Sequence, residues 1–473
     1  MYNRYRYTKI LGLPVFLLLM ACFTKLSAQI DIEFSHERGF YYAPISVVIS
    51  SPDDPNATIR FTTNNQRPSP TVGNIYTGPI SVSSTESIRA IAVSAAGISE
   101  VVTHTYLFVD DIKDQQGMSG HVPDAQIVLG LESLPAMSIV SRDIFSTNDI
   151  FVETETSIEL IFPNGDDGFM THCGIETWGG SPENPKNSYR FEFKSIYGDS
   201  KLDYDLFATD AYENHEYRVP PWLEFDNVLL RAGSQDGLNS EFGNENHSQF
   251  IRNRYIMDVA NELGFPHPHG RFVNTFINGE YVGQYHMMER PDESFFESYF
   301  GFDKDDYEVR RGNFDYWSGN LQGNGESVAH NNMTNNIDMS SAAAIANTNR
   351  FIDLRSAANY LVMMSYLSGF DWSDNQNSLS GGHPTPGVVP FKFLLWDVDF
   401  SLHQGGRWHP NFSGNVNYFN APFIEDGPVP PGLINSFEFR KMMGDQLHCA
   451  CFDDGPLTAA TVSYTHLTLP TKA

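Results

Sequence analysis

Two neighbouring stretches decide the fold of the C-terminal half, Gly369-Phe-Asp-Trp-Ser-Asp-Asn-Gln-Asn377 and Val388-Val-Pro-Phe-Lys-Phe-Leu-Leu-Trp-Asp-Val-Asp399. Apolar residues recur at helical spacing over 354–370, just before the first stretch. A turn rich in Gly and Pro separates the two stretches, and the second is an apolar run that ends in two aspartates. The sequence therefore predicts a buried helix, a polar loop, a turn and a strand with carboxylates at its end.

The order of these polar residues fits phosphoryl transfer. That chemistry needs a carboxylate near the attacking hydroxyl, a neutral oxygen ligand for a metal ion and a second carboxylate that holds the metal on the nucleotide phosphates. Kinase-like folds place the first two on a loop after a buried helix and the third at the end of the next strand. We therefore expect a catalytic residue, Asp371, and metal ligands, which are Asn375 or Asn377, Asp397 and the second candidate Asp399.

A purely structural interpretation of these residues stays open, because Asp and Asn also populate turns and cap strands. Hydrophobic residues flank the carboxylates on both sides, so these charges are expected close to a core. Carboxylates in such a place usually need a partner or a metal.

Composition limits the possible functions. The 473 residues are enough for two or three domains, and 41% of them are hydrophobic, which is enough for packed cores. With 30 Lys and Arg against 58 Asp and Glu, the formal charge is −28. This balance argues against nucleic-acid binding, which needs a basic surface, and favours cations or a basic protein partner.

The N-terminus is typical of an export signal. Basic residues precede an apolar run at 10–23, and small residues follow it, so we expect a signal peptide over 1–28 with cleavage after Ala28. The protein would then be secreted or lie at the cell surface or in the periplasm. Leu19-Met-Ala-Cys22 also fits a lipobox, so a membrane anchor is expected only if Cys22 is lipidated.

Short β-branched runs separated by turn residues predict an all-β, immunoglobulin-like sandwich over 30–108. The strings at 41–49, 59–63 and 88–92 resemble the chitobiase C-terminal-like, fibronectin-III-associated module. This resemblance implies a spacer or a surface-binding role, including a surface glycan as a partner. The polar segment 109–130 is expected to be a linker.

One α+β domain is expected over 131–461. Strands come first, a helix is predicted over 248–263, and Asn278-Gly279 between two alternating runs predicts a hairpin. Residues 314–350, rich in Asn, Gly and Ser, are expected to form a long loop. His267-Pro-His269 lacks a third ligand at a useful spacing for metal. The end of the chain, 462–473, back-translates to a transposase sequencing adapter and is expected to be an artefact, so that the natural C-terminus would be missing.

Further motifs follow one another in a consistent order. They are Gly179-Gly-Ser-Pro-Glu-Asn-Pro-Lys-Asn-Ser-Tyr-Arg-Phe-Glu-Phe-Lys194, Leu230-Arg-Ala-Gly-Ser234, Phe276-Ile-Asn-Gly-Glu-Tyr-Val-Gly-Gln-Tyr285 and Glu289-Arg-Pro-Asp292. Together with Gly369-Phe-Asp-Trp372 and Trp396-Asp-Val-Asp399, they make residues 131–461 resemble the CotH (spore-coat protein H) family of atypical kinases. The resemblance implies an atypical protein-kinase-like fold that uses ATP and Mg²⁺ or Mn²⁺.

Carried over to this sequence, the resemblance makes Asp371 the residue that orients or deprotonates the substrate hydroxyl. Glu289 would pair with a phosphate-binding lysine. Surface salt bridges remain the alternative for the basic residues that would cradle the nucleotide phosphates, which are Lys186, Arg190, Lys194 and Arg231. Gln376 occupies the place where the family pattern has Asn, with Asn375 and Asn377 on either side.

The expected function is therefore an exported kinase that transfers the γ-phosphate of ATP to Ser or Thr of surface or secreted proteins. Charge complementarity suggests a basic, Ser-rich protein substrate. The alternative is a non-catalytic adhesin or carbohydrate-binding protein at the cell surface, and a pseudokinase lies between the two.

Overall fold

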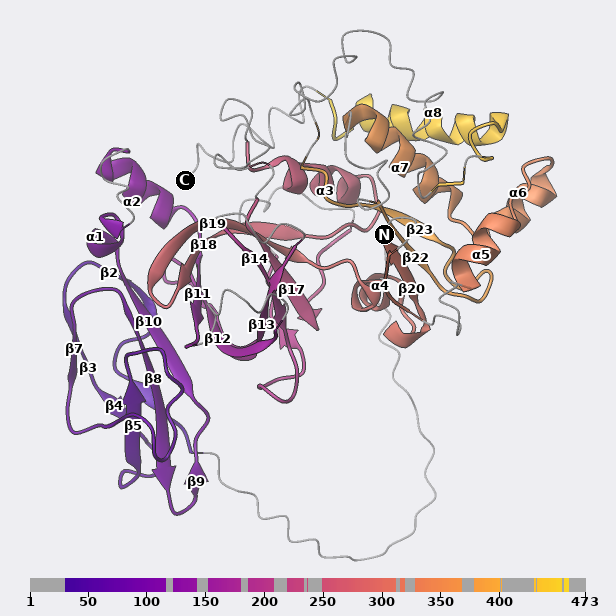
Figure 1. The fold of residues 1–473 in the computed structure, drawn as a ribbon. Helices are drawn as coiled ribbons and strands as arrows, with labels where there is room; N and C mark the ends of the chain where they lie inside the picture. Colours follow the sequence, from indigo (N-terminus) through magenta and orange to yellow (C-terminus); the bar gives the residue numbers. More distant parts are fainter. Residues whose placement is uncertain are drawn as a thin grey trace, which may run out of the picture.

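The computed structural model describes residues 30–115, 122–142, 152–179, 186–207, 219–233, 236, 249–311, 315–319, 328–367, 378–399, 401, 429–430, 432–452 and 455–458. An all-β region, a closed β-barrel and a C-terminal part of helices and a small sheet follow one another along the chain (Figure 1). The mixed α/β class with an all-β N-terminal region was predicted from the sequence.

The N-terminal region is built from short strands, as the spacing of turn residues predicts. Two small sheets pair β1 (Glu33–Phe34) with β4 (Ile49–Ser50) and β3 (Ile45–Val47) with β7 (Ile80–Val82). Apolar side chains of the whole region form one core that includes Val47, Ile88 and Tyr106. The larger sheet has the order β2 (Gly39–Tyr41), β10 (Val102–Phe108), β8 (Glu86–Ser94), β5 (Thr58–Thr62) and β6 (Asn74–Ile75), with β9 (Gly97–Ile98) on β8.

The segment expected to be a polar linker is partly helical and packed. It contains α1 (Val109–Ile112) and α2 (Asp124–Glu132). Apolar residues of both helices share a buried cluster with Leu107 of β10 and Phe276 of the barrel. The apolar face of these helices consists of Ile112, Ile127 and Leu131. The segment is otherwise so polar that its sequence does not indicate this face.

Seven strands close the barrel. Strands β11 (Ala136–Val140) and β18 (Gly270–Ile277) pair in parallel, and all other neighbouring strands of the barrel are antiparallel. The predicted hairpin joins β18 to β19 through Asn278 (φ 54°) and Gly279 (φ 84°), the left-handed backbone that a two-residue turn requires. The strand order is β11 (Ala136–Val140), β12 (Thr154–Ile161), β13 (Phe169–Trp178), β14 (Ser188–Glu192), β17 (Asn227–Arg231), β19 (Glu280–Glu289) and β18 (Gly270–Ile277).

The N-terminal all-β region, called the sandwich below, packs on the barrel through a buried polar interface. Glu159 of β12 is fully buried, and its carboxylate accepts hydrogen bonds from the backbone N–H (3.1 Å) and the hydroxyl of Thr105 in β10. Arg38 lies 3.5 Å from the same carboxylate, and Arg89 donates to the hydroxyl of Ser157 at 2.9 Å. Burial raises the pKa of Glu159 to about 7, although Arg38 acts in the opposite direction.

The C-terminal part combines a four-stranded sheet with helices. The sheet order is β21 (Asp315–Gly319), β20 (Glu308–Arg311), β22 (Ser378–Gly382) and β23 (Lys392–Leu395). A further two-stranded sheet, from the part of the chain between β14 and β17 of the barrel, pairs β15 (Leu202–Asp203) with β16 (Glu224–Phe225). The helices are α4 (Glu293–Phe300), α5 (Val328–Asn335), α6 (Ala342–Thr348), α7 (Leu354–Leu367) and α8 (Phe437–Cys451).

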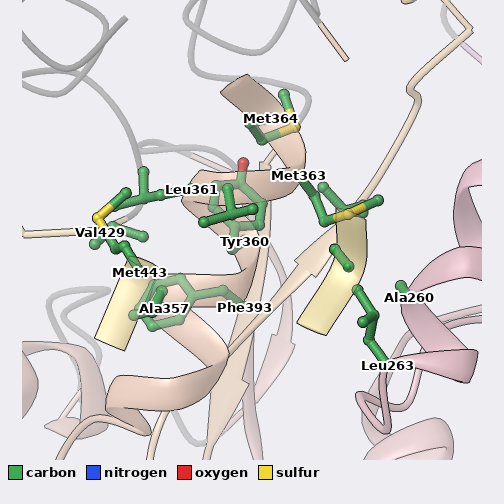
Figure 2. Packing of buried hydrophobic residues seen from close by; sticks show 14 of the residues in the cluster. Ala260, Leu263, Ala357, Tyr360, Leu361, Met363, Met364, Phe393, Val429 and Met443 are labelled. Atoms are coloured by element: carbon green, nitrogen blue, oxygen red, sulfur yellow. The ribbon is translucent and has the colours of Figure 1, made fainter. Parts of the chain in front are cut away.

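Helix α7 is the centre of the C-terminal core. Its predicted apolar face, including Ala357, Tyr360 and Met364, is buried against α8 and Phe393 of β23 (Figure 2). The same cluster includes Ala260 of α3 (Arg252–Glu262) and Leu263, the residue that follows this helix. Helix α3 therefore joins the barrel to the C-terminal part.

Two sequence predictions need correction in this region. Residues 314–350 hold strand β21 and helices α5 and α6, and Ser341 caps α6 by accepting from the backbone N–H of Ala344. The predicted helix over 248–263 begins at Arg252. Within the described residues, no helix is long and apolar enough to cross a membrane.

Candidate functional site

Two aspartates and one arginine meet between the barrel and the C-terminal sheet. Asp397 and Asp399 follow β23, whereas Arg231 is the last residue of β17. Nη2 of Arg231 donates to Oδ1 of Asp397 and to Oδ2 of Asp399, the latter at 2.7 Å. The structure thus brings together three of the side chains that the sequence marked for this site.

The backbone at Asp397 turns sharply. Its φ of 54° lies in the left-handed region, which few residues other than glycine adopt. Such conformations persist where the surroundings enforce them, and they cluster at functional sites. The turn presents the side chains of Asp397 and Asp399 to the same guanidinium group.

The electrostatics of this group favour a cation. Burial raises the pKa of Asp399 to about 6, and the charges of Asp397 and Asp236 act in the same direction while Arg231 opposes them. Burial disfavours the charge of Arg231, yet Asp399 and Asp397 together raise its pKa. Carboxylates that neighbour one another in a buried place need a positive charge between them.

Arg231 lies at one rim of the barrel, together with the beginning of β14. The residue that follows it, Ala232, donates its backbone N–H to the hydroxyl of Ser188 at 2.9 Å. In β19, His286 pairs with Arg231 across the strands. This rim therefore joins the segment that begins at Lys186 to the acidic pair.

Lys186 is a largely buried cation at this rim. Its Nζ donates to the carbonyl of Gln284 and lies 4.1 Å from the ring centre of Tyr285 and 5.1 Å from that of Phe250. Burial lowers its pKa to about 8. Within the described part of the chain, no carboxylate forms an ion pair with Lys186, so its charge has aromatic and carbonyl partners alone.

The other two lysine and arginine candidates are held by carboxylates. Arg190 lies 2.6 Å from both Glu176 and Glu192, and its guanidinium stacks 5.1 Å from the ring of Trp178. Lys194 pairs with Glu153. These contacts fit the alternative of structural salt bridges for both residues.

Glu289 has partners other than the lysine that the sequence analysis expected. Its carboxylate accepts from the hydroxyl of Tyr299 (2.8 Å) and from the backbone N–H of His269 (2.7 Å), and it lies 3.1 Å from that histidine's Nδ1. The expected lysine pair is thus replaced, in the described structure, by a buried Glu–His–Tyr group.

Residues 368–377, between α7 and β22, lie outside the described residues, and with them Asp371, Asn375 and Asn377. The residues on either side are described. Leu367 ends α7, and Ser378, the residue after Asn377, pairs with Leu395, two positions before Asp397. In the described ranges, no group of three or more His, Cys, Asp or Glu side chains could hold a metal ion.

Other polar residues at the site were not predicted from the sequence. Asp236 accepts from the backbone N–H of Gln249 at 2.9 Å and pairs with Arg252 of α3, and burial raises the pKa of Asp236. His286 is buried, and burial together with the charges of Arg254 and Arg231 holds its pKa well below the usual value. The one sequence feature that could have indicated these residues is the polar run Arg252-Asn-Arg254 at the beginning of α3. This run is buried, although its residue types favour the surface.

This arrangement defines a class of protein: a β-barrel joined to a helical part, with paired carboxylates at the junction and basic side chains on the barrel rim. The chain belongs to the CotH kinase protein family, whose model matches residues 176–428, more than half of the chain. The chitobiase/beta-hexosaminidase C-terminal domain model matches residues 36–104. Both predicted resemblances are thereby confirmed. No curated protein matches the chain.

Proposed function

We propose that this chain is an exported atypical protein kinase that transfers the γ-phosphate of ATP to Ser or Thr hydroxyls of surface or secreted proteins. The observation that carries the proposal is the convergence of Asp397 and Asp399 on one cationic group at the barrel rim. Membership of a kinase family supports the same reaction class.

The residues at the junction fit a divalent metal ion. Two carboxylate oxygens already converge on one positive group, the guanidinium of Arg231. Hard oxygen donors of this kind are the ligands that Mg²⁺ and Mn²⁺ prefer. Asp397 and Asp399 would hold the ion, with Asn375 or Asn377 as the neutral ligand. When bound, the ion would neutralise charge on the ATP phosphates.

Lys186 is the best candidate for holding the phosphates. Among the described residues no carboxylate pairs with it, and a largely buried ammonium group in such a place is poorly solvated and gains from an anionic ligand. Arg190 and Lys194 already have carboxylate partners, whereas Arg231 could exchange its aspartates for a phosphate when the metal ion enters.

In the transfer step, the oxygen of the substrate hydroxyl forms a bond to the γ-phosphorus of ATP. The bond from that phosphorus to the β–γ bridging oxygen breaks, and ADP leaves. The hydroxyl proton goes to the carboxylate of Asp371, as in other phosphoryl transfers where an aspartate receives it. Lys186 holds the phosphates in line for this attack.

Export and substrate choice are parts of the same proposal. The basic and apolar N-terminal pattern supports export, and Cys22 offers an anchor if it is lipidated. The formal charge of −28 supports a basic, Ser-rich protein substrate, because complementary charge speeds encounter.

The test is phosphate transfer by the purified full chain. The chain is incubated with ATP labelled in the γ-phosphate, MnCl₂ and a basic Ser-rich protein. We expect transfer to the protein, with a loss of at least about 100-fold in Asp371→Asn, since general acid–base catalysis alone contributes about 10²–10⁴-fold. Asp397→Asn, which weakens a metal ligand, should also lower the rate.

Asp305→Asn is the matched control, because Asp305 is an exposed residue of the 3-10 turn Lys304–Asp306. It should keep the wild-type rate. Absence of transfer by the wild type, or equal transfer by Asp371→Asn, would contradict the kinase proposal.

A carbohydrate-binding or adhesive role is the second candidate. The match of residues 36–104 to a domain that accompanies glycan-processing enzymes favours it. A glycan array and a thermal shift with ATP and Mn²⁺ separate the two functions. Glycan binding without any nucleotide shift would favour the adhesin, whereas a nucleotide shift without transfer would indicate a pseudokinase.

A further inference from the structure

The strand that leads to the acidic pair lies at the edge of its sheet. β23 pairs with β22 on one side, and in the described sheet it has no strand on the other. An edge strand leaves a row of backbone N–H and C=O groups that need other partners when they are buried. Phe393, Leu394 and Leu395 of β23 are buried.

The residues just before α7 and its first turn provide partners for the first half of this edge. Phe391 donates its N–H to the carbonyl of Phe351 and accepts from the N–H of Asp353, both at 2.9 Å. The hydroxyl of Ser356 accepts from the N–H of Phe393 at 2.9 Å and lies 3.3 Å from its carbonyl. The edge is thus fixed at every second residue.

At Leu395, the last residue of the β23 edge, the hydrogen-bond partner is a histidine from the segment between α3 and β18. Leu395 donates its N–H to Nε2 of His267 at 3.0 Å. Nδ1 of His267 lies 3.0 Å from the carbonyl of Phe265. These partners assign one tautomer, in which Nδ1 carries the proton and Nε2 accepts. Both ring nitrogens are engaged, which leaves none for a metal.

The imidazole is held firmly in this position. His267 lies between α3 and β18, and it is 1% exposed. The side chain of Asn261 in α3 accepts from the N–H of His267 at 2.8 Å and donates to its carbonyl at 3.0 Å. Burial lowers the pKa of His267 to about 4, and His269 and Arg254 act in the same direction, so the ring stays neutral as the bond from Leu395 requires.

We propose that His267 is a positioning residue for the acidic pair: its imidazole fixes the end of β23 and so sets where Asp397 and Asp399 present their carboxylates. This inference rests on the proposed function, because the pair is a metal site only if the chain is a kinase. Leu395 is two residues before Asp397, and the left-handed turn follows directly. Without the imidazole, Leu395 loses a buried hydrogen-bond partner, and the end of β23 loses its contact with the segment between α3 and β18.

The test compares three variants of the full chain. His267→Leu removes both ring hydrogen bonds, whereas His267→Gln keeps an acceptor for Leu395 and a donor for Phe265. His172→Leu is the matched control, because His172 is also buried and bonds through both ring nitrogens, to Ser157 and to the carbonyl of Val101. Thermal unfolding of each variant fixes a temperature at which all are folded.

Two measurements are then made at that temperature. Hydrogen–deuterium exchange, followed by mass spectrometry, reports on peptides that contain residues 392–399. Electron paramagnetic resonance gives the affinity for Mn²⁺ in the presence of a non-hydrolysable ATP analogue. We expect His267→Leu to exchange faster over 392–399 and to bind Mn²⁺ about 10- to 100-fold more weakly, the usual effect of removing a group that orients metal ligands.

The other two variants make the result specific. His267→Gln should restore both properties in large part, and His172→Leu should leave both at the wild-type level. Faster exchange with unchanged Mn²⁺ affinity in His267→Leu would overturn the proposal, since the histidine would then have a structural role alone. Unchanged exchange would overturn it as well. Absence of Mn²⁺ binding by the wild type would instead contradict the proposed function, and the exchange result would still decide whether His267 fixes the strand.

Discussion

Nη2 of Arg231 lies 2.7 Å from Oδ2 of Asp399, and the same nitrogen donates to Asp397. The guanidinium therefore occupies the oxygens that a divalent metal ion would need. If the site takes a metal ion as proposed, that ion would compete with Arg231 for these two carboxylates, because each neutralises the same pair of charges.

This competition gives the first prediction. Arg231→Met should bind Mn²⁺ more tightly than the wild type without nucleotide, by about 10-fold or more, since a single unit charge at this distance is worth more than about 1.4 kcal/mol even near a protein surface. Without Mn²⁺ the variant should lose about 3–5 kcal/mol of stability, the typical effect of leaving buried charges unpaired. Electron paramagnetic resonance and thermal unfolding with and without MnCl₂ measure both effects.

Arg190→Met provides the control for that variant. Arg190 also bridges two carboxylates, Glu176 and Glu192, but these lie on the barrel strands β13 and β14. It should lose stability without a gain in Mn²⁺ affinity. Equal Mn²⁺ affinity in Arg231→Met and the wild type would contradict the competition.

The second prediction concerns Lys186. Lys186→Met should weaken ATP binding about 10-fold, and Lys186→Arg should retain most of it, because a guanidinium also binds phosphate. The lowered pKa of Lys186, about 8, adds a pH dependence. The charged form is lost as the pH rises through this value, so wild-type affinity should fall above about pH 8 while that of Lys186→Arg stays constant. Isothermal titration calorimetry across this range measures both.

Lys201→Met is the matched lysine control for the nucleotide experiment. Lys201 is partly exposed and lies near Asp226 and Glu297, so its loss should leave ATP affinity unchanged. A Lys186→Met protein that binds ATP as the wild type does would remove Lys186 from the phosphate site.

The third prediction concerns the interface between sandwich and barrel. Burial raises the pKa of Glu159 from 4.5 to about 7, so its contribution to stability is fully present below about pH 4.5 and is lost as the pH rises to about 7. Glu159→Gln keeps the shape without the charge. Relative to the wild type, it should gain stability as the pH rises from about 4.5 to 7, on the order of 3 kcal/mol.

Urea unfolding at several pH values measures this difference. His172 of the interface and the buried His104 of the N-terminal region are present in both proteins, so their titration cancels in the comparison. Glu280→Gln, at an exposed position of β19, should show no such trend. A constant difference between Glu159→Gln and the wild type would show that Glu159 stays ionised in the interface.

The fourth prediction tests the core around α7. Met363 is fully buried in the cluster of Figure 2, and Met363→Ala should lower stability by about 2–5 kcal/mol, because the cavity cannot close completely. Tyr366→Ala, on the exposed side of the same helix, should change stability by less than about 1 kcal/mol. Urea unfolding compares the two, and similar losses in both would contradict this packing.

Local patterns in the sequence were sufficient for much of the fold. Asn278-Gly279 marked the hairpin, and the apolar spacing over 354–370 marked α7. The paired aspartates at the end of an apolar run located the acidic site. Each of these signals lies within a few residues, where turn chemistry and periodicity act directly.

Other features depend on contacts between distant segments. Arg231 is 166 residues from Asp397, and the closure of the barrel decides that they meet. Glu289 meets His269 rather than a lysine because β18 and β19 place them side by side. The helices within 109–130 and 314–350 were missed because their polar composition resembles that of loops, and only packing reveals the few apolar residues that they bury.

The interface of the sandwich with the barrel has a consequence for how such proteins can be rearranged. Glu159, Ser157 and Arg89 form hydrogen bonds across this interface, and Leu107 shares a buried cluster with Leu131. If recombination replaced the N-terminal module by an unrelated one, a buried carboxylate and several hydroxyls of the barrel would lose their hydrogen-bond partners. The two modules are therefore expected to be inherited together, and a shortened version for laboratory use is best begun before Ile30 rather than at the start of the barrel.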